Sequence, residues 1–263
     1  MGLSIIILNH NEKQSVLDCL ESLTPYLRHP ECECMVADNA STDGSIEELH
    51  GRFPYVKIIA NRTNTGISRA RNEAFREAAY PYVLSLDSDV KFISGDLFAG
   101  TAFLDSHPGT AMVGPRLLEA DGAVQYSCRR FLTAPVPVIS RLPFLKILPI
   151  LAVLENRHLM KEFDHAAECA VDYVLGACQL WKKSDFFTAG GYDERIFFGP
   201  EDADIGLRLR LAGKSVFYKP DIVFSHVHRR RTRDYLSPAA WRHLTSLVYY
   251  FRKHRYLFTP PAA

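Results

Sequence analysis

Short runs of β-branched residues alternate with helix-period segments through the first half of the chain, and no other feature constrains the fold as strongly. The first run is Ser4-Ile-Ile-Ile-Leu8, and a helical pattern follows it over about 13–27. Alternating apolar residues indicate strands, whereas apolar residues three to four positions apart indicate helices. Strands that alternate with helices are typical of βαβ units on a parallel sheet. We therefore predict an α/β fold with a Rossmann-like, mainly parallel central sheet flanked by helices.

The same patterns extend along most of the chain. Further strands are expected at 33–37, 56–60, 82–86, 110–114, 174–181, 215–218 and 222–226. Further helices are expected at 45–52, 67–79, 96–106, 183–189, 201–212 and from Pro238 to His254. Between 116 and 172 the alternation stops, and prolines and basic residues mix with apolar ones. We assign no secondary structure to this segment and expect a flexible insertion that sets specificity.

Two carboxylates follow the strand expected at 82–86, in the segment Asp87-Ser88-Asp89. Ligands of doubly wound sheets bind beyond the carboxyl ends of the strands, so both side chains are expected to face a ligand crevice. Mg²⁺ takes one or two protein carboxylates and fills its remaining positions with phosphate oxygens and water. An isolated Asp-x-Asp is also typical of a solvated turn, and on this motif alone both interpretations stay open.

His226 and His228 end the last expected strand, and alternation places both side chains on one face. An imidazole beside a carboxylate pair makes a mixed nitrogen and oxygen site that suits Mn²⁺ better than Mg²⁺. We predict that His226 is a metal ligand, with His228 as the alternative. Surface histidines without a ligand are the competing interpretation.

Acidic residues crowd the start of the helix expected at 201–212, in the segment 201–204. The helix macrodipole and the unpaired N–H groups favour acids there, so capping alone could explain them. The approach to the helix, from Gly190 to Pro200, is rich in glycine and aromatic residues, which capping explains less well. We predict that Asp202 is a general base beside the ligand crevice.

Taken together, these motifs resemble the inverting glycosyltransferases of family 2, which have the GT-A fold, and most nearly the bacterial branch that includes rhamnosyltransferases. The resemblance covers most of residues 3–226, with the motifs in order and at suitable separations. The matching stretches are 4–12, 36–44, 64–72, 86–89 and 190–213. The resemblance implies transfer of a sugar from a nucleoside diphosphate to a hydroxyl of a saccharide or lipid-linked acceptor. It favours dTDP-rhamnose as the donor, with uridine diphosphate sugars next.

The resemblance also implies roles for individual residues. Asp202 would be the base that deprotonates the acceptor hydroxyl, and Asp38 would hydrogen-bond the nucleotide base. Asp87, Asp89 and His226 would hold Mn²⁺ or Mg²⁺. The residues expected to bind the nucleotide are Leu8, Asn9, His10, Asn11, Glu12, Asp38, Asn39, Gly66, Arg69, Asp87 and Ser88. The residues expected to contact the sugar or the acceptor are Gly176, Ala177, Cys178 and Glu201.

Two positions depart from the family pattern. His10 stands where many relatives have tyrosine, which bears on how the nucleotide base would stack. The histidine segment continues into Arg229-Arg230-Arg231, where relatives often have a loop rich in glycine and serine. Because the second departure lies just after His226, it affects the assignment of His226 as a metal ligand.

We expect one domain in three parts: residues 1–115 as the nucleotide-sugar-binding half, 116–226 as the acceptor-binding and catalytic half, and 227–263 as a basic C-terminal helical extension.

Two other functions stay open. A sugar-phosphate nucleotidylyltransferase would share the sheet and the acidic metal site, but it needs a glycine-rich phosphate loop where this chain has polar residues at 9–12. A non-catalytic nucleotide-sugar-binding scaffold subunit would have no need for the full set of acids.

The distribution of charge along the chain indicates which partners and which cellular location to expect. The 31 basic and 30 acidic residues give a net charge of +1, which argues against a nucleic-acid binder. Residues 226–263 nevertheless carry eight Arg or Lys and one acid. Without a signal sequence, a membrane-spanning stretch or a disulfide pattern, we expect a cytoplasmic enzyme. The basic end and the apolar stretch 131–154 predict peripheral contact with the inner face of the cell membrane, and a homodimer is a further expectation.

Overall fold

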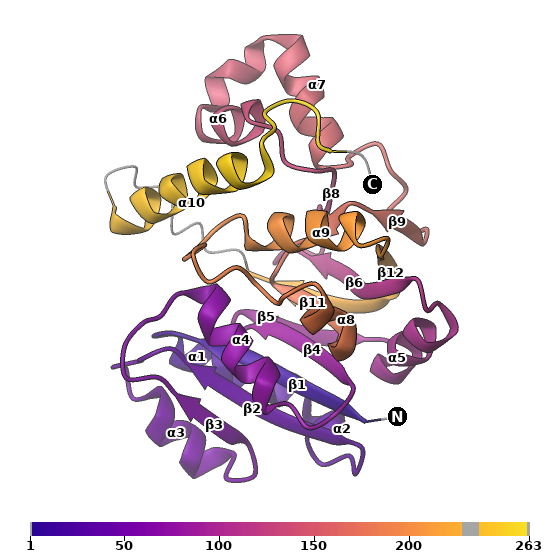
Figure 1. Ribbon diagram of the computed structural model, residues 1–263. Helices are drawn as coiled ribbons and strands as arrows, with labels where there is room; N and C mark the ends of the chain where they lie inside the picture. The colour runs from indigo at the N-terminus through magenta and orange to yellow at the C-terminus, as the bar shows by residue number, and fades with distance from the viewer. Residues whose placement is uncertain (1, 228–236, 262–263) are drawn as a thin grey trace.

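The computed structural model describes residues 2–227 and 237–261, and its centre is a sheet flanked by helices (Figure 1). One half of the sheet is parallel, with the strand order β3 (Lys57–Ala60), β2 (Cys32–Asp38), β1 (Leu3–Asn9) and β4 (Tyr82–Asp87). β1 is buried along its whole length, and Ile5 and Ile6 belong to two different core clusters. A strand covered on both faces is a nearly continuous apolar run, which explains the strong sequence signal of β1.

The other half of the sheet is mixed. β11 (Cys178–Lys182) is antiparallel to both β4 and β6 (Thr110–Leu118), and β12 (Ser215–His226) is parallel to β6. β5 (Val90–Ser94), which was not predicted, is antiparallel to β12 at the edge. The remaining short strands are β7 (Val124–Gln125), β8 (Cys128–Arg129), β9 (Cys169–Val171) and β10 (Tyr173–Val174). The predicted α/β class with a mainly parallel central sheet is confirmed.

The helices that pack on the sheet match the predicted ranges closely. They are α1 (Lys13–Ser22), α2 (Thr24–Leu27), α3 (Ser45–Arg52), α4 (Ile67–Glu77), α5 (Leu97–Ser106), α8 (Lys183–Thr188) and α9 (Glu201–Leu211). The single helix expected over 13–27 is instead two, because α1 ends at Ser22 and a new helix begins with Pro25 in its first turn. Proline lacks the N–H that a continuing helix would need.

Residues 116–172, to which the sequence patterns assign no secondary structure, contain several regular elements. Besides short strands, the segment contains α6 (Pro135–Arg141), the 3-10 helix η1 (Pro143–Ile147) and α7 (Pro149–His158). Each of these helices has a proline in its first turn. Proline suits that position because the first N–H groups of a helix have no partner within it. The prolines that interrupt the sequence pattern therefore mark helix starts.

The two strands predicted at 215–218 and 222–226 form one strand, β12. Its pairing with β6 shifts register between Lys219 and Val223. Pro220 lies in this interval and cannot donate to the ladder, so the strand continues past it through an irregularity. The continuation carries His226 to the carboxyl end of β4.

α10 (Pro238–His254) confirms the predicted C-terminal helix and lies beside α9 (Figure 1). Lys253 Nζ and His254 Nε2 lie 2.5 and 2.8 Å from an oxygen of the buried Asp204. Part of the basic charge of the C-terminal region is thus balanced by an acid of α9. The predicted features at His228 and Arg229-Arg230-Arg231 lie outside the described residues. Within the described ranges, no helix is long and apolar enough to cross a membrane.

Candidate active site

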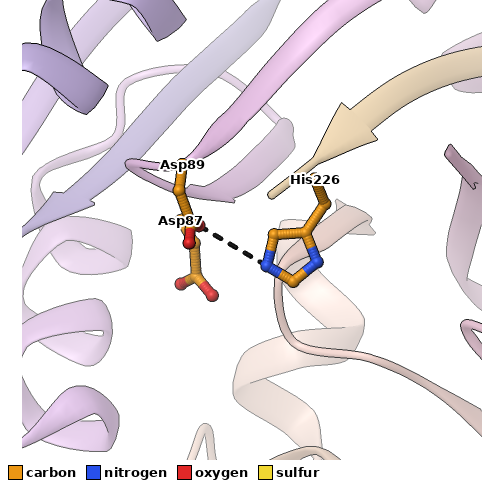
Figure 2. A group of neighbouring side chains, drawn as sticks. All are labelled: Asp87, Asp89 and His226. Atoms are coloured by element: carbon orange, nitrogen blue, oxygen red, sulfur yellow. Dashed lines mark ion pairs between the residues drawn. The ribbon is translucent and has the colours of Figure 1, made fainter. Parts of the chain in front are cut away.

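Three side chains that can bind a metal, those of Asp87, Asp89 and His226, come together at the carboxyl end of β4 (Figure 2). Asp87 ends β4, Asp89 lies in the turn to β5 with the buried Ser88 between them, and His226 ends β12. Pairing of β5 with β12 sets His226 opposite Val90 and so beside Asp89. The ligand atoms of the three residues lie within 4.8 Å of one another, and His226 Nε2 is 3.5 Å from Asp89 Oδ1.

The chemistry of this donor set fits a divalent cation. Two carboxylates and one imidazole leave the other coordination positions to phosphate oxygens and water. The mixed nitrogen and oxygen set suits Mn²⁺ better than Mg²⁺. The side chains of Asp87 and Asp89 are 32% and 19% exposed, so an ion can reach them from solvent. The structure therefore brings together the three residues predicted to bind a metal.

A chain of hydrogen bonds orients the His226 ring. Gln125 Nε2 donates to Glu119 Oε1 at 2.9 Å, which leaves Gln125 Oε1 facing His226 Nδ1 at 2.7 Å. Because that oxygen only accepts, Nδ1 carries a hydrogen and Nε2 is directed at Asp89. Burial lowers the pKa of His226. The hydrogen bond and charge of Asp89, together with the charge of Asp87, have a larger opposite effect, so the pKa is raised overall. Sequence reasoning missed Glu119 and Gln125 because no strand was expected at β7.

A buried arginine of α4, Arg71, contacts Asp87 from the protein interior. Its Nη2 donates to Asp87 Oδ1 at 2.5 Å and to the carbonyl of Gly176 at 2.8 Å, and its Nη1 lies 3.9 Å from Glu201 Oε1. Burial raises the pKa of Asp87, and the charge of Arg71 opposes that shift. Arg71 thus keeps the partly exposed carboxylate of Asp87 closer to the ionised form that a metal would need.

Sequence reasoning assigned a nucleotide contact to Arg69 and missed Arg71. Two residues that are two positions apart lie on nearly opposite sides of a helix. Arg69 is exposed and pairs with Glu73 at 3.1 Å, so the structure does not bring it to the metal-binding residues. Arg71 shares the buried face of α4 with Ser68 and Phe75. Their helical spacing was the signal that could have identified Arg71.

Gly176 joins the metal-binding residues to the start of α9. Its N–H donates to Asp202 Oδ2 at 3.2 Å, and its carbonyl accepts from Arg71. A Cβ at this position would lie 2.9 Å from Arg71 Nη1, so a larger residue would displace the guanidinium. The carbonyl of the next residue, Ala177, accepts the N–H of Asp87 at 2.9 Å. Two residues predicted to line the sugar pocket thus lie between Asp87 and Asp202.

Asp202 and Glu201, in the first turn of α9, have different surroundings. Asp202 lines a cavity of about 600 Å³. Glu201 instead faces Arg71, and its Oε2 accepts the N–H of Gly199 at 2.8 Å. Burial raises the pKa of Asp202 to about 6, whereas burial and the charge of Asp202 raise the pKa of Glu201 to about 8. The N–H groups of Gly176 and Ala203 donate to Asp202 and oppose the effect of burial, which favours the ionised form that a general base needs.

The residues predicted to bind the nucleotide base lie at the carboxyl ends of β1 and β2. Asp38 is fully buried, and its two carboxylate oxygens accept from Asn9 Nδ2 and from the N–H of Ser41, each at 2.8 Å. The N–H of Asn11 donates to Ser41 Oγ at 2.9 Å. The loop after β1 is thus fastened to the loop after β2. Leu8, His10 and Glu12, in and next to the loop after β1, are the other residues predicted to contact the nucleotide. Contact of any of these residues with a nucleotide stays a prediction.

Asn39 and Gly66 organise the loop that leads into α4. Asn39 Nδ2 donates to Asn64 Oδ1 at 3.0 Å, and Asn39 Oδ1 accepts the N–H of Thr65 at 3.0 Å. Gly66 has a φ of +86°, and a Cβ there would lie 2.8 Å from the carbonyl oxygen of Phe197. Glycine is required at this close approach. The loop thereby contacts the aromatic, glycine-rich segment that precedes α9.

Cys178, the third residue predicted to line the sugar pocket, is 2% exposed and packs in a core cluster. Burial raises the pKa of its thiol well above the usual value, which makes the side chain unreactive. All six cysteines are free thiols. Contact of Cys178 with a sugar stays a prediction. Because the side chain is buried, such a contact would have to come from the backbone of this residue.

The amino-acid sequence matches a family model, and rhamnosyltransferases are among its relatives. Residues 4–151, more than half of the chain, match the model described as Glycosyl transferase family 2. The chain is 28% identical over 239 residues to an N-acetylglucosaminyl-diphospho-decaprenol L-rhamnosyltransferase of Mycobacterium tuberculosis (strain ATCC 25618 / H37Rv), with 84% of this chain and 75% of the relative covered. It is 27% identical over 259 residues to rhamnosyltransferase WbbL of Escherichia coli (strain K12), with 96% and 94% covered.

The fold is similar to that of a solved glycosyltransferase structure, GalNAc-T7 with UDP, GalNAc and Mn²⁺. The TM-score is 0.67 at 15% sequence identity, with 94% of this chain and 48% of the GalNAc-T7 chain covered. The present chain thus spans about half the length of that protein. At this identity the similarity concerns the fold, and it confirms the predicted GT-A architecture.

Proposed function

Because this chain belongs to glycosyl transferase family 2, we propose that it transfers a sugar from a nucleoside diphosphate to an acceptor hydroxyl with inversion at the sugar carbon. One observation carries the proposal. Hydrogen bonds join the metal-binding Asp87, through Arg71 and Gly176, to Asp202. A metal position for the leaving diphosphate and a base for the attacking hydroxyl therefore belong to one connected framework.

Each side of this framework would act on one reactant. Asp87, Asp89 and His226 would hold Mn²⁺ or Mg²⁺, which when bound supplies positive charge to the leaving diphosphate. Asp202 would accept the proton of the acceptor hydroxyl while its oxygen bonds to the anomeric carbon and the bond to the diphosphate breaks. Attack opposite the leaving group inverts that carbon. Alignment of the two reactants contributes much of the rate enhancement.

The three parts of the chain would then divide the work. Residues 1–115 would bind the donor, 116–226 would bind the acceptor and supply Asp202, and 227–263 would form a basic helical extension. Both relatives are named as rhamnosyltransferases, which favours a rhamnose donor. We take dTDP-rhamnose as the first candidate and uridine diphosphate sugars as the next. The name of the mycobacterial relative also favours a lipid-linked acceptor over a free saccharide.

A panel of sugar nucleotides, offered with Mn²⁺, with Mg²⁺ and with EDTA, tests the proposal. We expect dTDP-rhamnose to raise the melting temperature only when a divalent metal is present, because a ligand that binds only the native state stabilises it. We also expect the protein to consume that donor and release dTDP. Stabilisation without any turnover would instead identify a binding scaffold. Formation of a sugar nucleotide from a nucleoside triphosphate and a sugar 1-phosphate would identify a nucleotidylyltransferase.

We further propose that the enzyme works at an anionic membrane surface. Phe144, Ile147 and Ile150, in η1 and at the start of α7, are 65%, 82% and 71% exposed. Segments 131–158 and 237–261 together carry seven Arg or Lys and one acid. Apolar side chains with a basic surround favour insertion into an anionic leaflet, where each cation contributes about 1 kcal/mol before screening.

Sedimentation with vesicles tests this location. The protein should sediment with anionic but not with zwitterionic vesicles, and less as salt rises. The double variant Ile147→Ser, Ile150→Ser should sediment less, whereas Ile93→Ser, at a residue 54% exposed in β5, should behave as the unaltered protein. Absence of binding to anionic vesicles at low salt would refute the location. A dimer that these two substitutions dissociate would assign the surface to the predicted homodimer instead.

A further inference from the structure

The segment 190–200, which we call the approach loop, leads directly into α9 and so decides where Asp202 lies. α9 begins at Glu201, and Asp202 is its second residue. The N–H of Gly199 donates to Glu201 Oε2 at 2.8 Å, which ties the end of the approach loop to the first turn of the helix. A shift of the approach loop would therefore move the first turn of α9, and the carboxylate of Asp202 with it.

α4 holds one side of the approach loop. The N–H of Ile67, the first residue of α4, donates to the carbonyl of Phe197 at 3.0 Å. Asn72, farther along α4, exchanges two hydrogen bonds with the backbone of Tyr192, at 2.8 and 2.9 Å. These bonds reach backbone atoms at both ends of the loop. The position of the loop on this side is therefore set by the helix that also carries Arg71.

α10 holds the other side of the approach loop. Arg242 Cζ lies 4.2 Å from the centre of the Phe197 ring, a distance at which a cation and an aromatic ring attract each other. The neighbouring His243 packs on Gly199, where a Cβ would lie 2.8 Å from His243 Nε2. The centres of the His243 and Phe198 rings are 5.8 Å apart. Three consecutive residues of the loop, just before α9, thus contact α10.

The C-terminal half of α10 is fastened to the same region. Tyr249 Oη donates to Asp193 Oδ2 at 2.8 Å, and Lys253 Nζ lies 2.9 Å from the same oxygen. Lys253 Nζ also lies 2.5 Å from Asp204 Oδ1 in α9. Arg242, Tyr249 and Lys253 are seven and four positions apart, which places them on one face of the helix. One face of α10 therefore contacts the approach loop near both of its ends, and α9 as well.

The contact of His243 with the approach loop is supported by α6. Arg141, at the end of α6, has its Nη2 2.5 Å from His243 Nδ1. Burial and the charge of Arg141 lower the pKa of His243 to about 4. The ring is consequently neutral near pH 7, and its Nδ1 can accept a hydrogen bond from Arg141. The insertion and the C-terminal helix thus act together on the approach loop.

We propose that α10 is a clamp that positions the base, in which Arg242 and His243 press the approach loop against α4 and so fix Asp202 relative to the candidate metal ligands. Arg242 lies outside the cavity that Asp202 lines, so it is a positioning residue that acts through Phe197. This inference rests on the proposed function for the role of Asp202. The order of the approach loop can nevertheless be measured without any substrate.

Amide hydrogen exchange of the full chain without ligand is the first test. Arg242→Gln removes the cation above Phe197 and keeps a polar side chain on the helix. We expect the hydrogen-bonded amides of Gly199 and Ala203 to exchange about two- to fivefold faster, the range that loss of an exposed cation–π contact gives. Exchange in β1 should not change, and the melting temperature should fall by at most about 4 °C.

Two further variants separate the cation–π contact from a general effect of substitution. Arg242→Lys keeps a cation that can reach the Phe197 ring and should restore slow exchange. Arg28→Gln is the matched control, because exposed Arg28, just after α2, lies over the ring of Tyr55 at 5.1 Å in the same kind of contact. The control should leave exchange at Gly199 and Ala203 unchanged.

The release of dTDP from dTDP-rhamnose with Mn²⁺, with water as the acceptor, is the second test. Arg242→Gln should lower kcat at least about fivefold, because a small displacement of a base from its reacting position is costly. The affinity for dTDP with Mn²⁺ should stay within about twofold. In a protein that already carries Phe197→Leu, adding Arg242→Gln should lower kcat no further, because the two side chains act as one contact.

Unchanged exchange at Gly199 and Ala203 in Arg242→Gln would overturn the inference. So would faster exchange throughout the chain, β1 included, since that result indicates a general loss of stability. Faster local exchange with an unchanged kcat would also overturn it, because the clamp would then not position the base. If the unaltered protein releases no dTDP, the proposed function is wrong for this donor, and the exchange rates alone decide whether α10 holds the approach loop.

Discussion

Replacement of Arg71 by methionine tests how the candidate metal ligands depend on the protein interior. The side chain is 1% exposed, and its Nη2 donates to both Asp87 and the carbonyl of Gly176. Removing one partner of a buried ion pair costs about 3–5 kcal/mol. Because the Asp87 side chain is 32% exposed, water compensates in part, and we expect a loss of about 3 kcal/mol. For a chain of this size that loss lowers the melting temperature by about 6–12 °C.

The same substitution should weaken metal-dependent donor binding. Arg71 is the strongest opponent of the effect of burial, so without it the pKa of Asp87 rises further and less of the carboxylate is ionised. The loss of affinity should therefore grow as the pH falls. Arg69→Met is the matched control: Arg69 is exposed and pairs with Glu73, so the change in stability should be within about 0.5 kcal/mol. Equal melting temperatures and equal nucleotide affinities in the two variants would refute the reasoning.

Three further predictions concern the metal ligands and the base. Asp89→Asn should weaken metal-dependent binding of the nucleoside diphosphate at least tenfold, about 1.4 kcal/mol, and calorimetry that finds the same affinity and the same metal dependence would contradict it. Gln125→Leu should lower the affinity for Mn²⁺ about tenfold, because His226 loses the acceptor that orients its ring, whereas Gln14→Leu on the exposed face of α1 should have no effect. kcat/KM should rise as the pH increases through about 6, because Asp202 acts as a base only after losing its proton, and a flat profile between about 5 and 8 would count against that role.

Local sequence patterns predicted the parallel half of the sheet and the acids at its edge. β1 and β4 are covered on both faces, so their sequences are mostly apolar and the polar residues at their ends stand out. Asp87 and Asp89 were identified for this reason. Asp202 was identified because acids at a helix start followed an aromatic, glycine-rich approach that capping does not explain.

The partners of those acids depended on contacts between segments distant in the chain. Arg71 reaches Asp87 across 16 positions, and Gln125 reaches His226 across 101. No spacing in the sequence encodes such pairs, although the buried face of α4 gave a local indication of Arg71. His226 could be proposed only as a strand-end histidine, because its position beside Asp89 follows from pairing of β12 with the unpredicted β5.

The helices of the insertion were missed for a different reason. Pro135 and Pro149 each stand in the first turn of a helix, where proline is favoured, but the mixture of prolines, basic residues and apolar residues around them hid the helical pattern. Sequence patterns could not predict the apolar groove between α6 and α10, because it forms only where these two distant segments pack together.

Rates of sugar transfer in Asp202→Asn and Glu201→Gln, measured beside donor affinity, test the central claim most directly. The N–H groups of Gly176 and Ala203 donate to different oxygens of Asp202, and asparagine keeps one of these two acceptors, so α9 should remain folded. We predict that Asp202→Asn lowers transfer by roughly two to four orders of magnitude while donor affinity stays within a few-fold, as for loss of a general base. Glu201→Gln, which alters the carboxylate facing Arg71, should be the milder change. Near-normal transfer by Asp202→Asn, or a larger loss in Glu201→Gln, would contradict the assignment of the base.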